Sequence, residues 1–131
     1  MADRVNPMIF VDIPATDPEA MSAFYEELFG WQVMEMPEMG YTIVSTGPSG
    51  DQGPTEAGYI GGGMLARQQA ATSGSVIVID VDSIDETLQR IDGMGGSTVV
   101  GRTPVGDMGF AAYFTDPEGN VVGLWETARQ T

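Results

Sequence analysis

The sequence contains no cysteine, no histidine and no lysine. Without cysteine the chain can form neither a disulfide nor a thiolate metal site. Without histidine it lacks the commonest metal ligand of proteins and the commonest general base near neutral pH. A Ser-His-Asp triad is therefore excluded, and no serine stands in the Gly-x-Ser-x-Gly context of a nucleophile elbow. Carboxylates are the main candidates for any acid–base or metal chemistry.

Long apolar runs are also absent. No stretch approaches the ~20 apolar residues that span a bilayer. The start of the chain, Met1–Arg4, does not open a basic and then apolar signal sequence. We therefore expect a soluble, cytoplasmic protein. Its 131 residues match one compact domain, and a chain of that size can bury about two-thirds of its unfolded surface.

Positive charge is scarce, because five arginines face 19 acidic residues and the net charge is −14. This charge repels nucleic acids and anionic membranes, so we expect neither as a partner. The acids are scattered along the chain, which favours a halophilic adaptation of the whole surface, since high salt screens self-repulsion. An acidic surface that binds cations or a cationic partner is the alternative.

The first half of the chain predicts a strand, a helix and three strands. Asp17 and Pro18 are typical of an N-cap and a first helical residue, and Gly30 ends the helix. A loop rich in glycine and proline is expected at 47–56, before a glycine-rich strand. The five expected elements are 8–13, 18–29, 31–36, 41–46 and 58–65.

The second half repeats this order. Ser83 and Glu86 form a capping-box pattern before a helical apolar stripe. Two runs rich in β-branched and aromatic residues flank the polar turn Asp116–Asn120, which is a hairpin signal. Alternation along the last run separates Gly123 and Trp125 from Leu124. The expected strands are 75–81, a short one at 97–100, then 110–115 and 121–126 after a loop at 101–109.

The two halves are offset by roughly 63–68 residues, which indicates a structural repeat. The sequence therefore predicts the α+β class, with two βαβββ modules that form a curved mixed sheet around a cleft. Module one covers 8–65 and module two covers 75–126, joined by a linker at 66–74. Because a half of ~60 residues would be marginal alone, we treat 1–131 as a single domain.

Two stretches carry a family resemblance. Asp17–Trp31 ends a helix in Phe-Gly-Trp, and Asp116–Glu126 reads Asp-Pro-Glu-Gly-Asn-Val-Val-Gly-Leu-Trp-Glu. They resemble the two signatures of the vicinal oxygen chelate superfamily, the group of glyoxalase I, bleomycin resistance proteins and extradiol dioxygenases. The likeness covers about residues 8–126 and is greatest to the small glyoxalase-like branch. It implies paired βαβββ modules around a cleft that homodimerisation usually completes.

Metal-dependent members of this superfamily hold one divalent ion with four side chains. The resemblance places the first-strand histidine at Phe10 and the last-strand carboxylate at Gly123. The other two ligands fall within 61–63 and at Val76 or Val78. None of these residues can coordinate a metal. We therefore expect no metal and no cofactor, and neither glyoxalase I isomerisation nor extradiol cleavage.

Three carboxylates remain as candidates for chemistry. Asp12 shares a strand face with Phe10, Asp80 has a similar place in module two, and Glu126 ends the last strand. They could form an oxygen-only site for Mg²⁺, Ca²⁺ or Mn²⁺, or an acid–base pair. Equally, Asp12 and Asp80 could bond backbone or water, and Glu126 could be solvated. The catalytic candidates are Asp12 and Asp80.

Aromatic and apolar residues could line a small-molecule pocket, although each could equally be ordinary core. The candidate ligand-binding residues are Phe10, Asp12, Trp31, Tyr41, Met64, Phe114, Gly123 and Trp125.

Three functions stay open. The first is metal-independent binding of a small molecule, by analogy with resistance proteins of the superfamily, which sequester a drug without chemistry. The second is a lyase or isomerase that uses Asp12 with a carboxylate partner, or a metal held by oxygen alone. The third is a dimeric scaffold without a ligand. Because one helix per module covers one sheet face only, we also expect a twofold homodimer.

Overall fold

A computed structural model describes residues 5–36, 41–47, 49–50, 53–54, 60–66 and 74–128. The chain forms two compact units, one of residues 10–75 and one of residues 1–9 with 76–131. We call them the N-unit and the C-unit. Their border lies next to the expected linker at 66–74, of which 67–73 fall outside the described residues. No helix in the described part of the chain has the length and apolar character needed to cross a bilayer.

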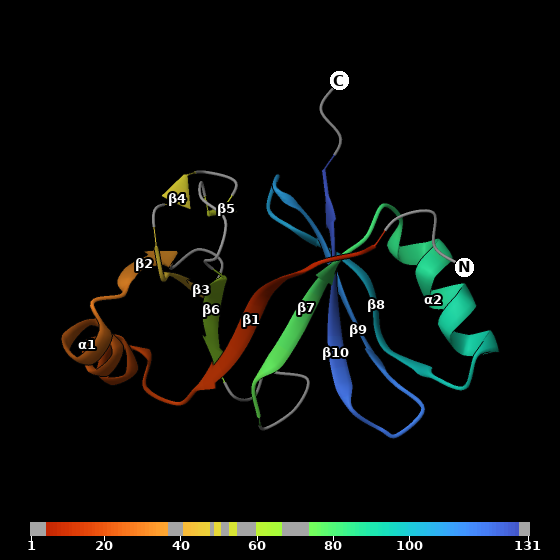
Figure 1. The fold of residues 1–131 in the computed structure, drawn as a ribbon, viewed down its shortest axis with the longest axis horizontal. Helices are drawn as coiled ribbons and strands as arrows, with labels where there is room; N and C mark the ends of the chain where they lie inside the picture. Colours follow the sequence, from red (N-terminus) through yellow and green to blue (C-terminus); the bar gives the residue numbers. More distant parts are fainter. Residues whose placement is uncertain are drawn as a thin grey trace. The chain divides into compact units, whose positions relative to one another are not determined.

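The N-unit follows the predicted order of strand, helix and strands (Figure 1). Its sheet has the order β2-β3-β6-β1. Strand β1 runs parallel to β6, and the other neighbours are antiparallel. Within the expected loop at 47–56, two-residue strands β4 and β5 pair with each other. The elements are β1 Met8–Ala15, α1 Pro18–Phe29, β2 Gln32–Met36, β3 Tyr41–Ser45, β4 Ser49–Gly50, β5 Gly53–Pro54 and β6 Gly61–Ala66.

Local signals set the ends of α1 as predicted. The Asp17 carboxylate accepts a hydrogen bond from the Ala20 N–H at 3.1 Å, and Pro18 follows it as the first helical residue. Gly30 ends the helix in the left-handed conformation, with φ of 71°, which glycine adopts without steric cost. The preceding strand differs from the prediction, because β1 continues through Pro14 to Ala15. The φ angle of proline suits an extended backbone, and Pro14 lacks only the backbone N–H that another residue would donate to the sheet.

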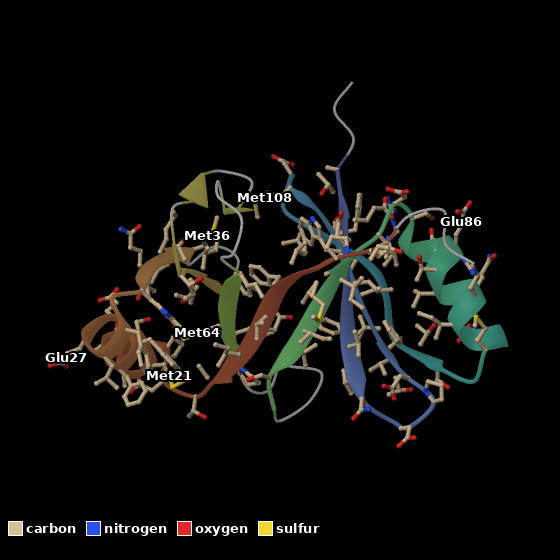
Figure 2. The ribbon with its side chains drawn as sticks, viewed as in Figure 1. Met21, Glu27, Met36, Met64, Glu86 and Met108 are labelled. Carbon is tan, nitrogen blue, oxygen red and sulfur yellow. The ribbon has the colours of Figure 1, made fainter. Side chains whose placement is uncertain are left out.

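The helix-covered face of the N-unit sheet forms a small core. Ala15, Val44 and Met64 are buried there, and Met21 of α1 packs against them. Figure 2 shows Met21 and Met64 in this region, between the helix and β6. Trp31 joins the same cluster and stacks on Tyr25 at 4.6 Å between ring centroids. The helix contributes no fully buried residue of its own.

The C-unit repeats the arrangement with the sheet order β7-β10-β9-β8. Strand β10 is parallel to β7 and antiparallel to β9, which is antiparallel to β8. Ser83 accepts the Glu86 N–H at 3.2 Å, as the capping pattern predicts. The core cluster is Val81, Ile84, Leu88, Ala112 and Leu124. The elements are β7 Val76–Asp80, α2 Ile84–Gly93, β8 Ser97–Val105, β9 Gly109–Thr115 and β10 Val121–Thr127.

Strand β8 was wrongly predicted as a short strand at 97–100 followed by a loop at 101–109. It extends to Val105, and only a turn at 106–108 separates it from β9. Its pairing with β9 shifts register between Thr98 and Val100 and again between Val100 and Thr103. The second shift accommodates Gly101, whereas Pro104 pairs in register with Phe110, as an outer strand allows. Glycine and proline in this stretch otherwise suggest a loop. The α+β class with two βαβββ modules and mixed strand pairing is confirmed.

Candidate functional site

Strand alternation divides the candidate residues of the N-unit between two faces of its sheet. Ile13 pairs with Met64 on the face covered by α1, whereas Asp12 pairs with Gly63 on the opposite face. Phe10 lies two residues before Asp12 in β1, so both side chains are on the same face of the sheet. We call the face away from the helix the distal face of each unit. In the N-unit its larger side chains are Phe10, Asp12, Gln32, Met34, Met36, Tyr41, Ile43 and Leu65.

Three sequence-predicted residues meet on this distal face. The Tyr41 hydroxyl donates a hydrogen bond to Asp12 Oδ1 at 3.2 Å. The Phe10 and Tyr41 rings are nearly parallel, with 6.3 Å between centroids and 19° between planes. Asp12 is buried, with 7% of its surface exposed. The group therefore combines two aromatic rings with one carboxylate, and its members come from β1 and β3.

The glycine run of β6 makes room for this group. A methyl group at residue 63 would overlap the hydroxyl end of Tyr41, so the phenol occupies the space of a missing side chain. At Gly62 a Cβ would lie 2.8 Å from the carbonyl oxygen of Val11, whereas at Gly61 its nearest neighbour would be 3.6 Å away. Close approach thus requires glycine at 62 and 63. Glycine inside a strand either bends the backbone or leaves space for a close neighbour, and here it leaves space.

The positions that the resemblance assigns to metal ligands lie in neighbouring pairs. Phe10 pairs with Gly61 across β1 and β6, and Gly123 pairs with Val78 across β10 and β7. None of these side chains carries a donor atom. Around Gly123 the space is lined by Val78 Cγ2 and Tyr113 Cε1, which a Cβ would meet at 3.0 and 3.3 Å. Within the described ranges, no three His, Cys, Asp or Glu residues are grouped closely enough to hold a metal ion.

In the C-unit the distal face carries Trp125 and Asp80, which pair across β10 and β7, together with Gly123. The Trp125 indole N–H donates to Thr127 Oγ1 at 3.1 Å. The backbone of Asp80 binds the segment before β1, since the Asp80 N–H donates a hydrogen bond to the Pro7 carbonyl at 3.0 Å. Its carbonyl accepts a hydrogen bond from Asn6 Nδ2 at 3.1 Å.

Three of the proposed ligand-binding residues lie on helix-covered faces. Met64 is only 1% exposed, and Trp31 packs on the same cluster. Phe114 pairs with Val122 in β10 and packs against the core beneath α2. The structure therefore groups Phe10, Asp12 and Tyr41, and separately Asp80, Gly123 and Trp125. It does not bring Trp31, Met64 or Phe114 onto the distal faces.

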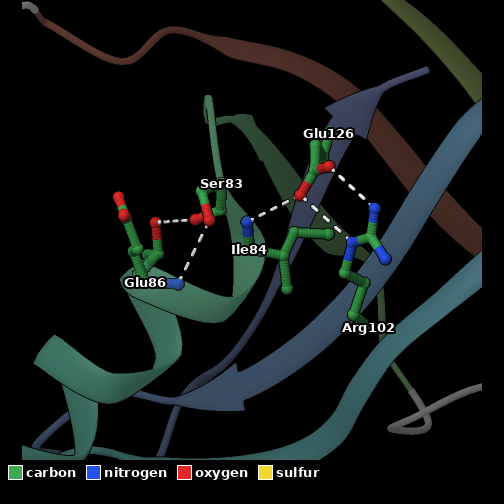
Figure 3. Close-up of polar contacts among 6 residues, drawn as sticks. Ser83, Ile84, Glu86, Arg102 and Glu126 are labelled. Carbon is green, nitrogen blue, oxygen red and sulfur yellow. Dashed lines mark hydrogen bonds and ion pairs between the residues drawn. The ribbon is translucent and has the colours of Figure 1, made fainter. Parts of the chain in front are cut away.

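Glu126 has a structural role that the sequence did not reveal. Its Oε1 accepts the backbone N–H of Ile84 at 2.9 Å, which satisfies a donor at the start of α2 (Figure 3). Arg102 binds the same carboxylate through Nη2 at 3.0 Å and Nε at 3.3 Å. The Glu126 side chain is 15% exposed, so it is not solvated. Strand alternation places Glu126 on the other face from Trp125, and the structure shows that this is the helix-covered face, where Glu126 pairs with Phe110.

Arg102 was not singled out in the sequence, because nothing local links it to Glu126, 24 residues away. Its hydrogen bond to Glu126 raises the pKa of the guanidinium above its ordinary value. The guanidinium carbon also lies 3.5 Å from the centroid of the Phe110 ring, a cation–π geometry. The only signal in the sequence was a basic residue in a stretch expected to be a loop.

Comparisons with known proteins agree with the fold. Residues 8–124 match the family model of the Glyoxalase/Bleomycin resistance protein/Dioxygenase superfamily. CFP32 of Mycobacterium tuberculosis, named as a candidate glyoxylase, is 29% identical over 128 residues, which cover 92% of this chain and 45% of that protein. A glyoxylase-like domain-containing protein of Didymella fabae is 30% identical over 117 residues, 84% of this chain and 85% of that one.

Among solved structures, methylmalonyl-CoA epimerase from Mycobacterium tuberculosis has a TM-score of 0.63 at 14% identity, and the match covers 98% of this chain and 93% of the epimerase. At this identity the likeness shows the fold alone. The chain spans about half the length of the mycobacterial CFP32 that it matches. The family match over residues 8–124 carries the assignment: the chain belongs to the Glyoxalase/Bleomycin resistance protein/Dioxygenase superfamily.

Proposed function

We propose that this member of the glyoxalase superfamily binds a small organic molecule without using the superfamily's metal ion. The observation that carries the proposal is the pairing of Phe10 with Gly61, and of Val78 with Gly123, at the positions expected to hold the metal. These four residues offer no nitrogen, oxygen or sulfur donor in their side chains. Apolar surface therefore replaces the ligands that the superfamily's metal chemistry would need.

The distal face of the N-unit has the composition of a ligand site. Small-molecule sites are mostly apolar, with a few polar groups that fix orientation. Phe10 and Tyr41 present stacked rings, and Met34, which pairs with Ile43 on the same face, is 62% exposed. The described residues of the unit include one helix, α1, which packs on the other face. Asp12, held by Tyr41, supplies the polar group.

Binding of Nile red, a neutral apolar dye, tests this proposal. Titrations in EDTA should saturate at one equivalent per chain. Phe10→Ala should weaken binding by about tenfold, since losing roughly 50 Å² of apolar contact at ~25 cal/mol per Å² costs about 1.3 kcal/mol. Phe24→Ala is the matched control, because Phe24 is 53% exposed on α1. Dye binding that requires added Zn²⁺ or Ni²⁺, or that Phe10→Ala leaves unchanged, would contradict the proposal.

A lyase or isomerase is the second candidate, and the buried Asp12–Tyr41 pair favours it. A buried carboxylate within hydrogen-bond distance of a phenol resembles the acid–base pairs that move protons in such reactions. The candidate partner Asp80 belongs to the C-unit. Methylmalonyl-CoA in D₂O, followed by NMR, tests α-proton exchange. We expect none with the wild-type protein. Metal-free exchange that disappears in Asp12→Asn would favour the enzyme.

We also propose a twofold homodimer, because the described residues of each unit include one helix, which covers only one sheet face. A stable interface should exceed about 1,200 Å² in total. Light scattering in 1 M KCl should give twice the chain mass of 13.9 kDa. A mass near one chain at micromolar concentration would contradict the dimer. A dimer that binds no probe would favour the third function, a scaffold without a ligand.

A further inference from the structure

The two helices of the chain bury different amounts of apolar surface, although they have the same place in their modules. In the C-unit, α2 places Ile84 and Leu88 in the core. In the N-unit no residue of α1 is fully buried. Its side chains Phe24, Leu28 and Phe29 are exposed to 53%, 59% and 62%. The apolar surface of α1 is therefore larger than the part that its own sheet covers.

We call Phe24, Leu28 and Phe29 the α1 patch. Phe24 and Leu28 are four residues apart, so they are neighbours on the helix surface. At about 200 Å² per aromatic side chain, the two phenylalanines alone expose roughly 230 Å². With Leu28 the patch reaches the few hundred Å² that monomeric proteins rarely expose as one surface. Apolar patches of this size mark interaction sites.

Aromatic rings around the patch hold one another in place. Between ring centroids, Tyr25 lies 5.1 Å from Phe24 and 6.2 Å from Phe29. Tyr25 also stacks on Trp31 at 4.6 Å, and Phe29 lies 5.9 Å from Trp31. Rings that are already fixed lose little conformational freedom when a partner binds, and Trp and Tyr are enriched among residues that carry binding energy. The patch is therefore suited to a protein partner.

The charges of the N-unit decide which partner fits. Every charged side chain described in this unit is acidic, and α1 carries Glu19, Glu26 and Glu27. Glu26 and Glu27 stand between Phe24 and Leu28 in the sequence, and Figure 2 shows Glu27 on the outer side of α1. A second copy of α1 would place like charges against these carboxylates, whereas lysine or arginine would be attracted to them.

From this combination we infer that the α1 patch docks an amphipathic helix of a partner protein, with apolar residues three and four positions apart and lysine or arginine beside them. Met21, Phe24 and Leu28 have the matching spacing. The 12 residues of α1 offer about 18 Å of helix, the length of roughly three turns. The inference goes beyond the proposed function, because the proposed ligand site and homodimer concern the faces away from the helices.

Three fluorescein-labelled peptides of 14 residues test the inference. The first has leucine at this helical spacing and lysine elsewhere, the second has glutamate in place of every lysine, and the third has the composition of the first in scrambled order. Binding is measured by fluorescence anisotropy in 0.5 M KCl. The Debye length there lies between the ~8 Å of 0.15 M and the ~3 Å of 1 M salt, so adjacent charges still interact. We expect one equivalent of the first peptide to bind, at least tenfold more tightly than the third, and the second not to bind.

Substitutions that keep α1 helical locate the binding surface. The double variant Leu28→Ala/Phe29→Ala should weaken binding of the lysine peptide at least tenfold, and alanine is the best helix former, so α1 is preserved. Met94→Ala is the matched control, since Met94 is an exposed apolar residue at the end of α2. It should change the affinity less than twofold. Equal effects of the double variant and the control would overturn the inference.

Charge reversal separates the carboxylates of α1 from the total charge. Glu27→Lys should weaken binding of the lysine peptide at least fivefold, and Glu118→Lys, in an exposed turn of the C-unit, less than twofold. Equal effects would overturn the inference, since the attraction would then come from the net charge of −14. A dimer that Leu28→Ala/Phe29→Ala converts to a monomer would also overturn it and assign the patch to a second copy. If Nile red binds but the lysine peptide does not, the inference fails and the proposed function stands.

Discussion

The space above Gly63 allows a direct test of how the Asp12–Tyr41 pair is built. In Gly63→Ala the new methyl group would overlap the Tyr41 hydroxyl and lie 2.6 Å from Tyr41 Cε2. Because only the tip of the ring is in the way, Tyr41 can swing aside, but it then leaves Asp12. Losing a hydrogen bond to a charged group costs about 1.5–3 kcal/mol.

A smaller effect acts in the opposite direction. Replacing glycine by alanine restricts the unfolded chain and contributes about 0.4–1 kcal/mol of stability. We therefore expect Gly63→Ala to lower the free energy of unfolding by about 1–2 kcal/mol, measured by urea denaturation in 1 M KCl. Gly61→Ala on the same strand face is the control. Its Cβ would meet only ordinary contacts, the nearest at 3.6 Å, so it should be neutral or stabilising.

A double-mutant cycle assigns the cost to Tyr41. In a Tyr41→Ala background the obstacle and the hydrogen bond are both absent, so Gly63→Ala should stabilise the protein by about 0.4–1 kcal/mol. The coupling energy between the two sites should therefore equal the cost of the lost hydrogen bond, about 1.5–3 kcal/mol. If Gly63→Ala costs the same with and without the Tyr41 ring, the phenol does not occupy that space and the reasoning fails.

Four further predictions concern stability. Glu126→Ala should cost about 1–3 kcal/mol in urea denaturation, because the Ile84 N–H loses its acceptor, and Glu126→Gln, which keeps an acceptor oxygen, should cost less; equal losses would contradict the role of Oε1. Ser22→Ala should stabilise the protein by about 0.5–1 kcal/mol, because the Ser22 hydroxyl is buried without a partner among the described residues and alanine is the better helix former; a loss of stability would contradict this. Hydrogen bonds from the side chain and backbone of Asn120 lower the pKa of Asp116 below its ordinary value of 3.8. The stability that these bonds contribute is therefore present above pH 3.8 and is lost as the pH falls through the folded-state pKa. Asp116→Asn should flatten the loss of stability below pH 3.8, and an unchanged loss of stability in acid would refute this prediction. Raising KCl from 0.01 to 1 M should raise the thermal midpoint strongly, since the Debye length falls from ~30 to ~3 Å; a flat response would favour a dedicated cationic partner over a halophilic surface.

The sequence alone determined the order of elements and most of their ends. Caps such as Asp17 and Ser83 act within three residues, and apolar periodicity acts within a single helix or strand, so both can be identified without knowing the fold. Alternation also predicted correctly that Gly123 and Trp125 share a face and that Leu124 lies on the other. The resemblance identified the superfamily for the same reason, because its two signatures are continuous stretches.

Tertiary structure decided which of these residues meet. Tyr41 reaches Asp12 across 29 residues of sequence, and this depends on the registers of β1 and β3 against β6. The extension of β8 beyond 100 depended on bulges that only its pairing with β9 reveals. Strand alternation shows that two residues lie on opposite faces, but not which face a helix covers. That choice is made by long-range packing, and it left Phe10, Asp12 and Tyr41 on the distal face while burying Met64 beneath α1.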